Sequence, residues 1–541
     1  MHGLMMGRPL TVSSILQHAE QFHHQGEIVS RKPEGGIHRY TYRDAARRSR
    51  QAANALRRLN IATDDRVATL AWNTHRHYEL YYAVSGLGAI LHTINPRLFP
   101  EQIAYIINHA EDRILCVDLQ FLPLVEALKD QLGTLEHIIV LAPAEAIPDT
   151  PLDVLSYEEL LAAEDDQLVW PELHEDQAAA LCYTSGTTGH PKGVLYSHRS
   201  TVLHAWASAS RDVLNIGNDR TILPVVPMFH VNAWGVPYSA TMAGAKLVLP
   251  GPGMDGASLY ELIDGEQVDM LLGVPTVWLG LLQYCDQHNL TLTPVRDVVV
   301  GGSAAPLSMI RDFDEKHDAF VIHAWGMTEM SPVGTVNSRS RLMNQLSKAE
   351  RYALQCKQGR PVFGVEMKIV DDQGAPLPHD GKAWGRLLVR GPWVAQSYYK
   401  HDDRSAWKDG WFDTGDVATI DENGLMQIVD RAKDVIKSGG EWISSIDLEN
   451  QAMGHPAVAE CAVIGVPHPK WDERPVMLVV TKPGQAVSGE ELKDWLGQHI
   501  ARWQLPDKIL FVDELPHTPT GKLLKRALRE QYQDILISDQ G

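Results

Sequence analysis

The sequence predicts an α/β protein with a large N-terminal domain and a small mobile α+β C-terminal domain. The chain has 541 residues, whereas a single hydrophobic core rarely serves more than about 300, so several domains are expected. Continuous apolar strands alternate with helix-length segments, which is typical of parallel sheets covered by helices on both faces. From residue 360 or so, short strands separated by turns such as DDQG (371–374) indicate an antiparallel region. The large domain should therefore hold two parallel-type αβ subdomains and a β-barrel-like subdomain.

The first clear element is a helix over residues 41–59. Thr41 and Asp44 have the spacing of a capping box, and alanines and leucines recur on one helical face. Six arginines, at positions 43, 47, 48, 50, 57 and 58, also lie on this helix. In a chain with a net charge of −19, we expect them to form a solvated helix face rather than a nucleic-acid site.

Apolar runs predict strands along the large domain, at residues 66–73, 113–118, 137–141, 246–250, 269–275 and 297–302. The last hundred residues contain two strands (VAECAVIGV and PVMLVV), a helix (GEELKDWLGQHIAR) and a further strand (KILFVDELP). The charged segment DRAKD (430–434) separates this unit from the body. We therefore expect an N-terminal domain over 1–430, a hinge at 431–433 and a C-terminal domain over 434–541.

Composition and charge exclude several classes of function. The acidic balance argues against nonspecific nucleic-acid binding. Five widely spaced cysteines without a C-x-x-C pair predict neither a disulfide framework nor a zinc site, and favour a reducing compartment. The N-terminus lacks the pattern of a signal peptide, and prolines interrupt the most apolar stretch, 222–244, so we expect a cytoplasmic protein without an integral membrane segment. The histidine pairs at 23–24 and at 75 and 77 should be ordinary surface residues rather than metal ligands.

The densest chemical signal is the stretch YTSGTTGHPKG (183–193). Its glycines permit backbone conformations in which successive N–H groups face an anion, its threonines and serine add hydroxyl donors, and Lys192 adds a positive charge. A triphosphate needs this combination. The stretch is not a Walker motif, because Gly193 follows the lysine where Ser or Thr is required. The alternative interpretation is a flexible surface turn.

Four weaker motifs support a nucleotide site. GGSAAP (301–306) ends an apolar strand, where small residues let a ligand approach the backbone. AWGMTE (324–329) combines an aromatic face for a base with a carboxylate for Mg²⁺. TGD (414–416) offers a carboxylate to ribose hydroxyls, and TGK (520–522) places a lysine on a glycine turn.

In their order and spacing, these motifs resemble those of the adenylate-forming superfamily, which includes acyl-CoA synthetases, peptide-synthetase adenylation domains and beetle luciferases. The stretches VVPMFHVNAWG (225–235) and KSGGEWIS (437–444) are most similar to bacterial fatty acyl-CoA ligases of medium- to long-chain type and to 3-methylmercaptopropionate-CoA ligases. The resemblance implies an AMP-forming ligase that uses ATP, Mg²⁺ and CoA. A carboxylic acid would become an acyl-adenylate with release of pyrophosphate, and CoA would then displace AMP. The resemblance is also compatible with a homodimer.

The resemblance implies a role for each motif residue. The phosphates of ATP would be bound by Thr184, Ser185, Gly186, Thr187, Thr188, Gly189 and Lys192. The rest of the nucleotide would contact Gly302, Ser303, Ala304, Ala324, Trp325, Gly326, Met327, Asp416 and Arg431. Catalysis would involve Lys522, Glu329, Thr328 and His230, with Mg²⁺ at Thr184 and Glu329 and a hinge at Lys433. The acyl chain and CoA would contact His230, Val231, Trp234, Gly235, Gly439, Gly440, Glu441 and Trp442.

Two departures and three alternatives qualify this interpretation. The family commonly has tyrosine where Trp325 stands and arginine where His517 stands; stacking on adenine survives the first change, whereas a phenolic hydrogen bond does not. Trp234 could be a movable gate or core packing. A short-chain or 3-methylmercaptopropionate ligase is the nearest alternative function. A luciferase-like monooxygenase is more remote, because the chain ends in SDQG rather than Ser-Lys-Leu.

Overall fold

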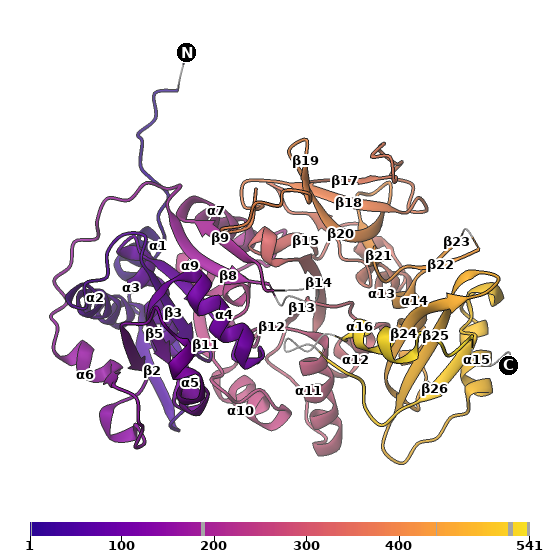
Figure 1. Ribbon diagram of the computed structural model, residues 1–541, viewed down its shortest axis with the longest axis horizontal. Helices are drawn as coiled ribbons and strands as arrows, with labels where there is room; N and C mark the ends of the chain where they lie inside the picture. Colours follow the sequence, from indigo (N-terminus) through magenta and orange to yellow (C-terminus); the bar gives the residue numbers. More distant parts are fainter. Residues whose placement is uncertain (2, 185–189, 440, 518–522, 538–541) are drawn as a thin grey trace.

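The computed structural model describes the chain except residues 2, 185–189, 440, 518–522 and 538–541 (Figure 1). A nine-stranded sheet forms the centre of the large domain. Its order is β16 (Arg360–Pro361), β15 (Val333–Asn337), β14 (Phe320–Gly326), β13 (Asp297–Val300), β12 (Met270–Gly273), β10 (Thr221–Pro224), β11 (Lys246–Leu249), β1 (Glu27–Arg31) and β2 (Ile37–Thr41). The strands from β14 to β1 are parallel, and antiparallel strands close both edges.

A second, seven-stranded sheet is parallel except at its β8–β9 edge. Its order is β7 (Val154–Ser156), β6 (His137–Val140), β5 (Asp112–Val117), β3 (Arg66–Leu70), β4 (Ile90–Thr93), β8 (Ala178–Tyr183) and β9 (Gly193–Ser197). All six strands predicted from apolar runs are present, so the expectation of parallel αβ subdomains is confirmed. Their residues alternate between faces, as in β13, where Val299 enters one core while Val298 and Val300 enter another.

The two sheets and their helices form five layers. Helices α4 (Pro100–Ala110) and α5 (Leu122–Leu128) cover the outer face of the seven-stranded sheet. Between the sheets lie α1 (Val12–Phe22), α2 (Tyr42–Arg58), α3 (His75–Gly86), α7 (His198–Ala209) and α9 (Val236–Ala243). The outer face of the nine-stranded sheet packs on α10 (Gly256–Glu266), α11 (Pro275–His288) and α12 (Leu307–His317). The largest core therefore sits between the sheets.

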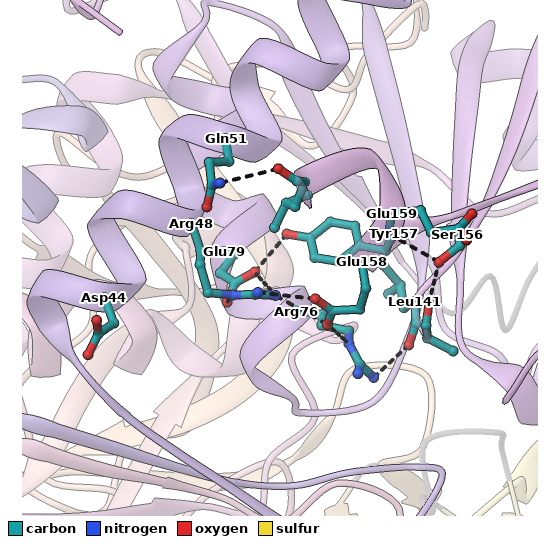
Figure 2. A network of polar contacts seen from close by, with 12 residues as sticks. Asp44, Arg48, Gln51, Arg76, Glu79, Leu141, Ser156, Tyr157, Glu158 and Glu159 are labelled. Carbon is teal, nitrogen blue, oxygen red and sulfur yellow. Dashed lines mark hydrogen bonds and ion pairs between the residues drawn. The ribbon is translucent and has the colours of Figure 1, made fainter. Parts of the chain in front are cut away.

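Every residue of α3 is buried, so its charged side chains need partners inside the protein. Glu79 accepts a hydrogen bond from Arg48 Nε at 2.7 Å and another from the Tyr157 hydroxyl at 2.8 Å, as Figure 2 shows. Arg76 pairs with Glu158 at 2.6 Å, and Tyr157 and Glu158 belong to α6 (Tyr157–Ala162). This network ties α2, α3 and α6 together.

Two expectations about surface residues are corrected here. The capping box of α2 forms as predicted, but Arg48 and Arg50 are not part of a solvated face, because Glu79 and Glu20 neutralise them. His75 and His77 are buried in α3 instead of lying at the surface. The sequence could not reveal the arginine pairs, since Glu79 and Glu20 lie 31 and 30 residues away in the chain. The burial of the histidines follows from the position of α3 between the two sheets.

The region after residue 360 folds as the predicted antiparallel unit, and the small C-terminal domain follows it (Figure 1, yellow). The antiparallel strands are β17 (Glu366–Val370), β18 (Gly385–Arg390), β19 (Trp407–Lys408), β20 (Trp411–Ile420) and β21 (Met426–Arg431). The C-terminal sheet contains β22 (Ile436–Ser438), β23 (Glu441–Ile443), β24 (Val458–His468), β25 (Asp472–Thr481) and β26 (Lys508–Phe511). Its helices are α14 (Ser445–Met453), α15 (Gly489–Gly497) and α16 (Lys525–Tyr532). Within the described residues, no helix has both the length and the apolar character that a membrane span needs.

Candidate active site

A cavity of about 340 Å³ opens where β10, β12 and β13 end. The chain passes from β10 to β11 on one side and returns to β12 on the other, which makes this edge a topological switch point, the usual place of ligand crevices in open parallel sheets. Most of the residues that line the cavity are apolar. The lining consists of Arg97, Val225, Val226, Pro227, Phe229, His230, Trp234, Met254, Asp255, Gly256, Val274, Thr276, Val277, Gly280, Gly302 and Ser303.

Four residues that the sequence singled out, namely His230, Trp234, Gly302 and Ser303, therefore meet in one cavity. The rings of Trp234 pack against the backbone of Gly301, at the end of β13, so this side chain forms part of the cavity wall. Two others, Val231 and Gly235, are buried in the same turn but are not among the lining residues.

The turn that carries Trp234 has a left-handed backbone. Val231, Asn232, Ala233 and Trp234 have φ between 47° and 56°, and Gly235 has φ 75°. Consecutive non-glycine residues in this region are rare, because the conformation costs roughly 1–2 kcal/mol per residue. Such strain persists only where the surroundings determine the backbone.

Asn232 is the main anchor of this turn. Its Oδ1 accepts hydrogen bonds from Thr93 Oγ1 and Cys182 Sγ, both at 3.3 Å, and all three side chains are buried. Gly235 is packed against the ring of His204, where a Cβ would lie 2.8 Å from Nδ1. Burial lowers the pKa of His204 to about 3, so its neutral Nε2 accepts a hydrogen bond from the Val333 N–H.

The predicted nucleotide residues continue from this cavity along β14. Trp325 Nε1 donates a hydrogen bond to Asp416 Oδ2 at 3.0 Å, and Arg431 Nε pairs with Asp416 Oδ1 at 2.9 Å. Residues from β14, β20 and β21 are thus brought together as the motifs suggested. Gly326 is required by close packing, since a Cβ there would lie 2.0 Å from the Pro332 carbonyl oxygen.

Asp416 is only 2% exposed, and both its oxygens already have partners. A ribose bound there would share this carboxylate with the indole N–H of Trp325. Ala324 and Met327 are half-buried beside Trp325 in the sequence, and Ala304 is half-buried in the segment after β13.

Beyond β14, the chain turns through Thr328 and Glu329, both nearly buried. The Tyr196 hydroxyl donates to the Thr328 carbonyl oxygen at 2.6 Å. The Tyr398 hydroxyl donates to Glu329 Oε1 at 2.6 Å, and the Lys192 ammonium lies 4.8 Å from the centre of the same tyrosine ring. Sequence reasoning missed Tyr398, because it belongs to none of the motifs.

The ends of the glycine-rich loop are held by two strands and by α4. Thr184 and Lys192 exchange hydrogen bonds between the ends of β8 and β9, with Thr184 N to Lys192 O at 2.9 Å. Tyr105 of α4 stacks on His190 with ring centres 4.4 Å apart. Ser185, Gly186, Thr187, Thr188 and Gly189 lie outside the described residues.

The oxygen atoms at this site fit a magnesium ion that arrives with ATP. Mg²⁺ is commonly held by one or two carboxylates together with substrate phosphates. Glu329 offers one carboxylate. Its Oε1 accepts from Tyr398, and within the described residues no side chain or backbone N–H donates to its Oε2. Within that part, no three His, Cys, Asp or Glu residues cluster as a protein-only metal site would need.

The C-terminal residues of the prediction lie apart from the cavity. Gly439, Glu441 and Trp442 belong to the β22–β23 hairpin, and among the described residues they are absent from the cavity lining. Trp442 packs instead against Val417 and Val429. Lys433 is exposed in the turn after β21. Gly440 and Lys522 lie outside the described residues.

Volume alone would not have identified this site. A larger groove, of about 1290 Å³, lies between α7 and the β16–β17 region, and none of the sequence-predicted site residues lines it. The meeting of the motifs at the carboxyl ends of the strands marks the smaller cavity as the candidate site.

Comparisons with known proteins agree with this geometry. Residues 16–399 match the model of the AMP-binding enzyme family, and residues 447–522 match its C-terminal domain. The chain is 52% identical to a 3-methylmercaptopropionyl-CoA ligase of Ruegeria lacuscaerulensis over 99% of this chain and 100% of that protein. It is 50% identical to a medium-chain-fatty-acid–CoA ligase of Ectopseudomonas oleovorans, over 99% and 98%. An anthranilate CoA ligase solved with anthranoyl-AMP superposes with a TM-score of 0.86 at 27% identity, over 97% and 98% of the two chains. The chain therefore belongs to the AMP-binding enzyme family.

Proposed function

We propose that this protein is an acid–CoA ligase that activates a medium- to long-chain fatty acid with ATP, forms an acyl-adenylate and passes the acyl group to CoA. The observation that carries the proposal is the continuity of the site. The apolar cavity reaches Gly302 and Ser303, and the neighbouring strand leads to Trp325 and then to Glu329. An acyl chain and a nucleotide would thus meet end to end.

The side chains suit the joining of two anions. A carboxylate that attacks the α-phosphate of ATP must overcome charge repulsion, so the site has to supply fixed positive charge and oriented donors. Lys192 provides positive charge, the charge of Arg431 is already paired with Asp416, and the half-buried Trp325 offers an aromatic face for the base. Mg²⁺ bound at Glu329 with the phosphates would neutralise further negative charge. His230, from the cavity wall, would lie beside the reacting carboxylate.

The second step requires other groups, which the small domain would bring. In this proposal, residues 434–541 turn about a hinge at 431–433, with Lys433 at its centre. Lys522 serves adenylation, and the β22–β23 hairpin with Gly439, Gly440, Glu441 and Trp442 serves thioester formation. The position of this hairpin away from the cavity supports two arrangements of the domain. Lys522→Ala should abolish acyl-AMP formation yet largely spare thioester formation from supplied acyl-AMP; equal loss of both would refute domain alternation.

The cavity indicates the length of the acyl chain. Two cavity-lining residues mark its two ends: Val274, which lies against Gly302 just before α11, and Gly280 within α11. They are six residues apart, which corresponds to about 9 Å along the helix axis. An extended acyl chain of about 9 Å has roughly seven bonds, if it advances per bond as an extended polypeptide backbone does, which spans about 3.6 Å per three bonds. Gly280 is exposed, so a longer chain would continue toward solvent rather than meet a floor. This geometry favours acids of medium length and longer.

The runner-up substrate is 3-methylmercaptopropionate, the acid named for one relative, which would fill only part of the cavity. The test is ATP- and CoA-dependent AMP release over straight-chain acids from C2 to C18, with this thioether acid included. Each buried methylene adds roughly 0.8 kcal/mol, or about fourfold in affinity, so kcat/KM should climb steeply to C8. A maximum at C4–C5 or at the thioether acid would establish the alternative. An absence of AMP with every acid would refute the ligase proposal.

We also infer that the enzyme works in the cytoplasm, and we propose a homodimer on the family resemblance alone. Five free cysteines, four of them buried, support a reducing environment. Light scattering after gel filtration should give twice the monomer mass, and a monomer mass would refute the dimer.

A further inference from the structure

Tyr398 lies between the two groups that would bind the metal and the phosphates of ATP. It belongs to the segment that joins β18 to β19. Its hydroxyl donates to Glu329 Oε1 at 2.6 Å, and the face of its ring lies 4.8 Å from Lys192 Nζ. One side chain thus contacts both a carboxylate after β14 and a lysine before β9.

The position of Tyr398 is itself fixed. Its ring packs edge-on against Trp407, with ring centres 5.0 Å apart and planes at 78°. The Trp407 indole donates to the Ala395 carbonyl oxygen at 2.6 Å, and the Ala395 N–H donates to the Glu329 backbone oxygen at 2.7 Å. The segment is therefore tied to the backbone of the residue whose side chain it orients.

The chemistry of the two contacts differs. The Tyr398 hydroxyl donates a hydrogen bond to the Glu329 carboxylate at 2.6 Å. This bond occupies Oε1 of Glu329 and leaves Oε2 for other ligands. The ring face attracts the Lys192 ammonium without neutralising its charge, as a carboxylate would.

We propose that Tyr398 is a positioning residue that sets Glu329 to bind the divalent cation and Lys192 to bind the phosphates of ATP in a single arrangement. The hydroxyl performs the first task and the ring the second. The inference rests on the proposed nucleotide site, although its test does not require that any particular acid be the substrate.

Two substitutions separate the tasks. Tyr398→Phe removes the hydroxyl and keeps the ring, whereas Tyr398→Leu removes both. Tyr399→Phe is the matched control, because it deletes the hydroxyl of the next residue. Within the described residues, the Tyr399 hydroxyl makes no hydrogen bond. All three variants are compared as full-length proteins with thermal midpoints within a few degrees of the unsubstituted protein.

The first readout is the affinity of the ATP complex for Mn²⁺, a probe for the Mg²⁺ position, measured by electron paramagnetic resonance. The second is the affinity for metal-free ATP, measured by calorimetry. Loss of a hydrogen bond to a charged group should weaken Mn²⁺ binding about tenfold in Tyr398→Phe and leave metal-free ATP unchanged. Tyr398→Leu should also weaken metal-free ATP binding about threefold through the lost cation–π contact.

Unchanged Mn²⁺ affinity in Tyr398→Phe, or an equal loss in Tyr399→Phe, would overturn the proposal. Acyl-AMP formation by the unsubstituted protein is measured in parallel. Its absence with every acid would refute the ligase function without altering the metal-binding result, so the two failures are distinguishable.

Discussion

The left-handed turn at residues 231–235 predicts an unusual response to glycine. Ala233 lies in this turn with φ 48° and ψ 43°, and it is fully buried. Ala240 is equally buried but belongs to the regular helix α9. Replacing each alanine with glycine removes one methyl group from the same core, yet the backbone consequences are opposite.

The magnitudes follow from the two conformations. Each substitution loses roughly 0.8 kcal/mol of methyl burial. At Ala240, glycine costs about 1 kcal/mol more in a helix, so the free energy of unfolding should fall by about 2 kcal/mol. At Ala233, the same entropic cost of glycine is opposed by relief of roughly 1–2 kcal/mol of left-handed strain, so the net change should be close to zero. The two variants should therefore differ by about 1–2 kcal/mol, the strain that glycine relieves at position 233.

Urea denaturation followed by tryptophan fluorescence measures this difference. Because Trp234 directly follows Ala233, the Ala233→Gly variant should also raise KM for the acid and leave KM for ATP unchanged. Equal destabilisation by Ala233→Gly and Ala240→Gly would show that the turn is not left-handed, and the argument for a strained cavity wall would fail.

Three further predictions concern other parts of the chain. Glu79→Gln should lower stability by about 1–2 kcal/mol, because it removes the buried carboxylate that Arg48 and Tyr157 contact and leaves only Glu158 to pair with Arg48, while kcat stays unchanged; normal thermal stability would refute the role of the network. Gly280→Phe should reduce kcat/KM for acids beyond C8 and spare butyrate, because a side chain at this cavity-lining residue enters open space that a longer acyl chain would use. Gly265→Phe, on the exposed end of α10, is the control and should change neither value. Retained activity of Gly280→Phe with palmitate would contradict the assigned course of the acyl chain. Burial raises the pKa of Asp118 to about 7, so the folded protein holds a proton there that the unfolded chain loses above about pH 4. The free energy of unfolding should therefore fall between about pH 4 and pH 7. Asp118→Asn should remove this fall, and parallel stability–pH curves for the two proteins would refute the assignment.

The fold was predictable where local signals and layer architecture agree. The apolar runs at 297–302 and 269–275 correspond to β13 and β12, and the capping residues Thr41 and Asp44 begin α2. Boundaries were less predictable. The helix expected over GEELKDWLGQHIAR ends at Gly497; residues 498–500 form a turn, and a 3₁₀ turn at Arg502–Gln504 precedes β26.

The candidate site was predictable in its motifs but not in its connections. Four motif residues meet in the cavity, and Trp325, Asp416 and Arg431 join as their order suggested. Tyr398 was not foreseen, since a lone tyrosine between strands has no local signature. The left-handed turn was not foreseen either, because its sequence lacks glycine until Gly235 and tertiary contacts of Asn232 impose it.

The most direct test of the account follows the oxygen atoms of the acid. Octanoate labelled with ¹⁸O in both carboxyl positions is incubated with the enzyme, ATP, Mg²⁺ and CoA, and the products are examined by mass spectrometry. Attack of the carboxylate on the α-phosphate predicts one ¹⁸O atom in AMP and one in the octanoyl thioester. AMP without label, or label in released inorganic phosphate with formation of ADP, would contradict an acyl-adenylate route.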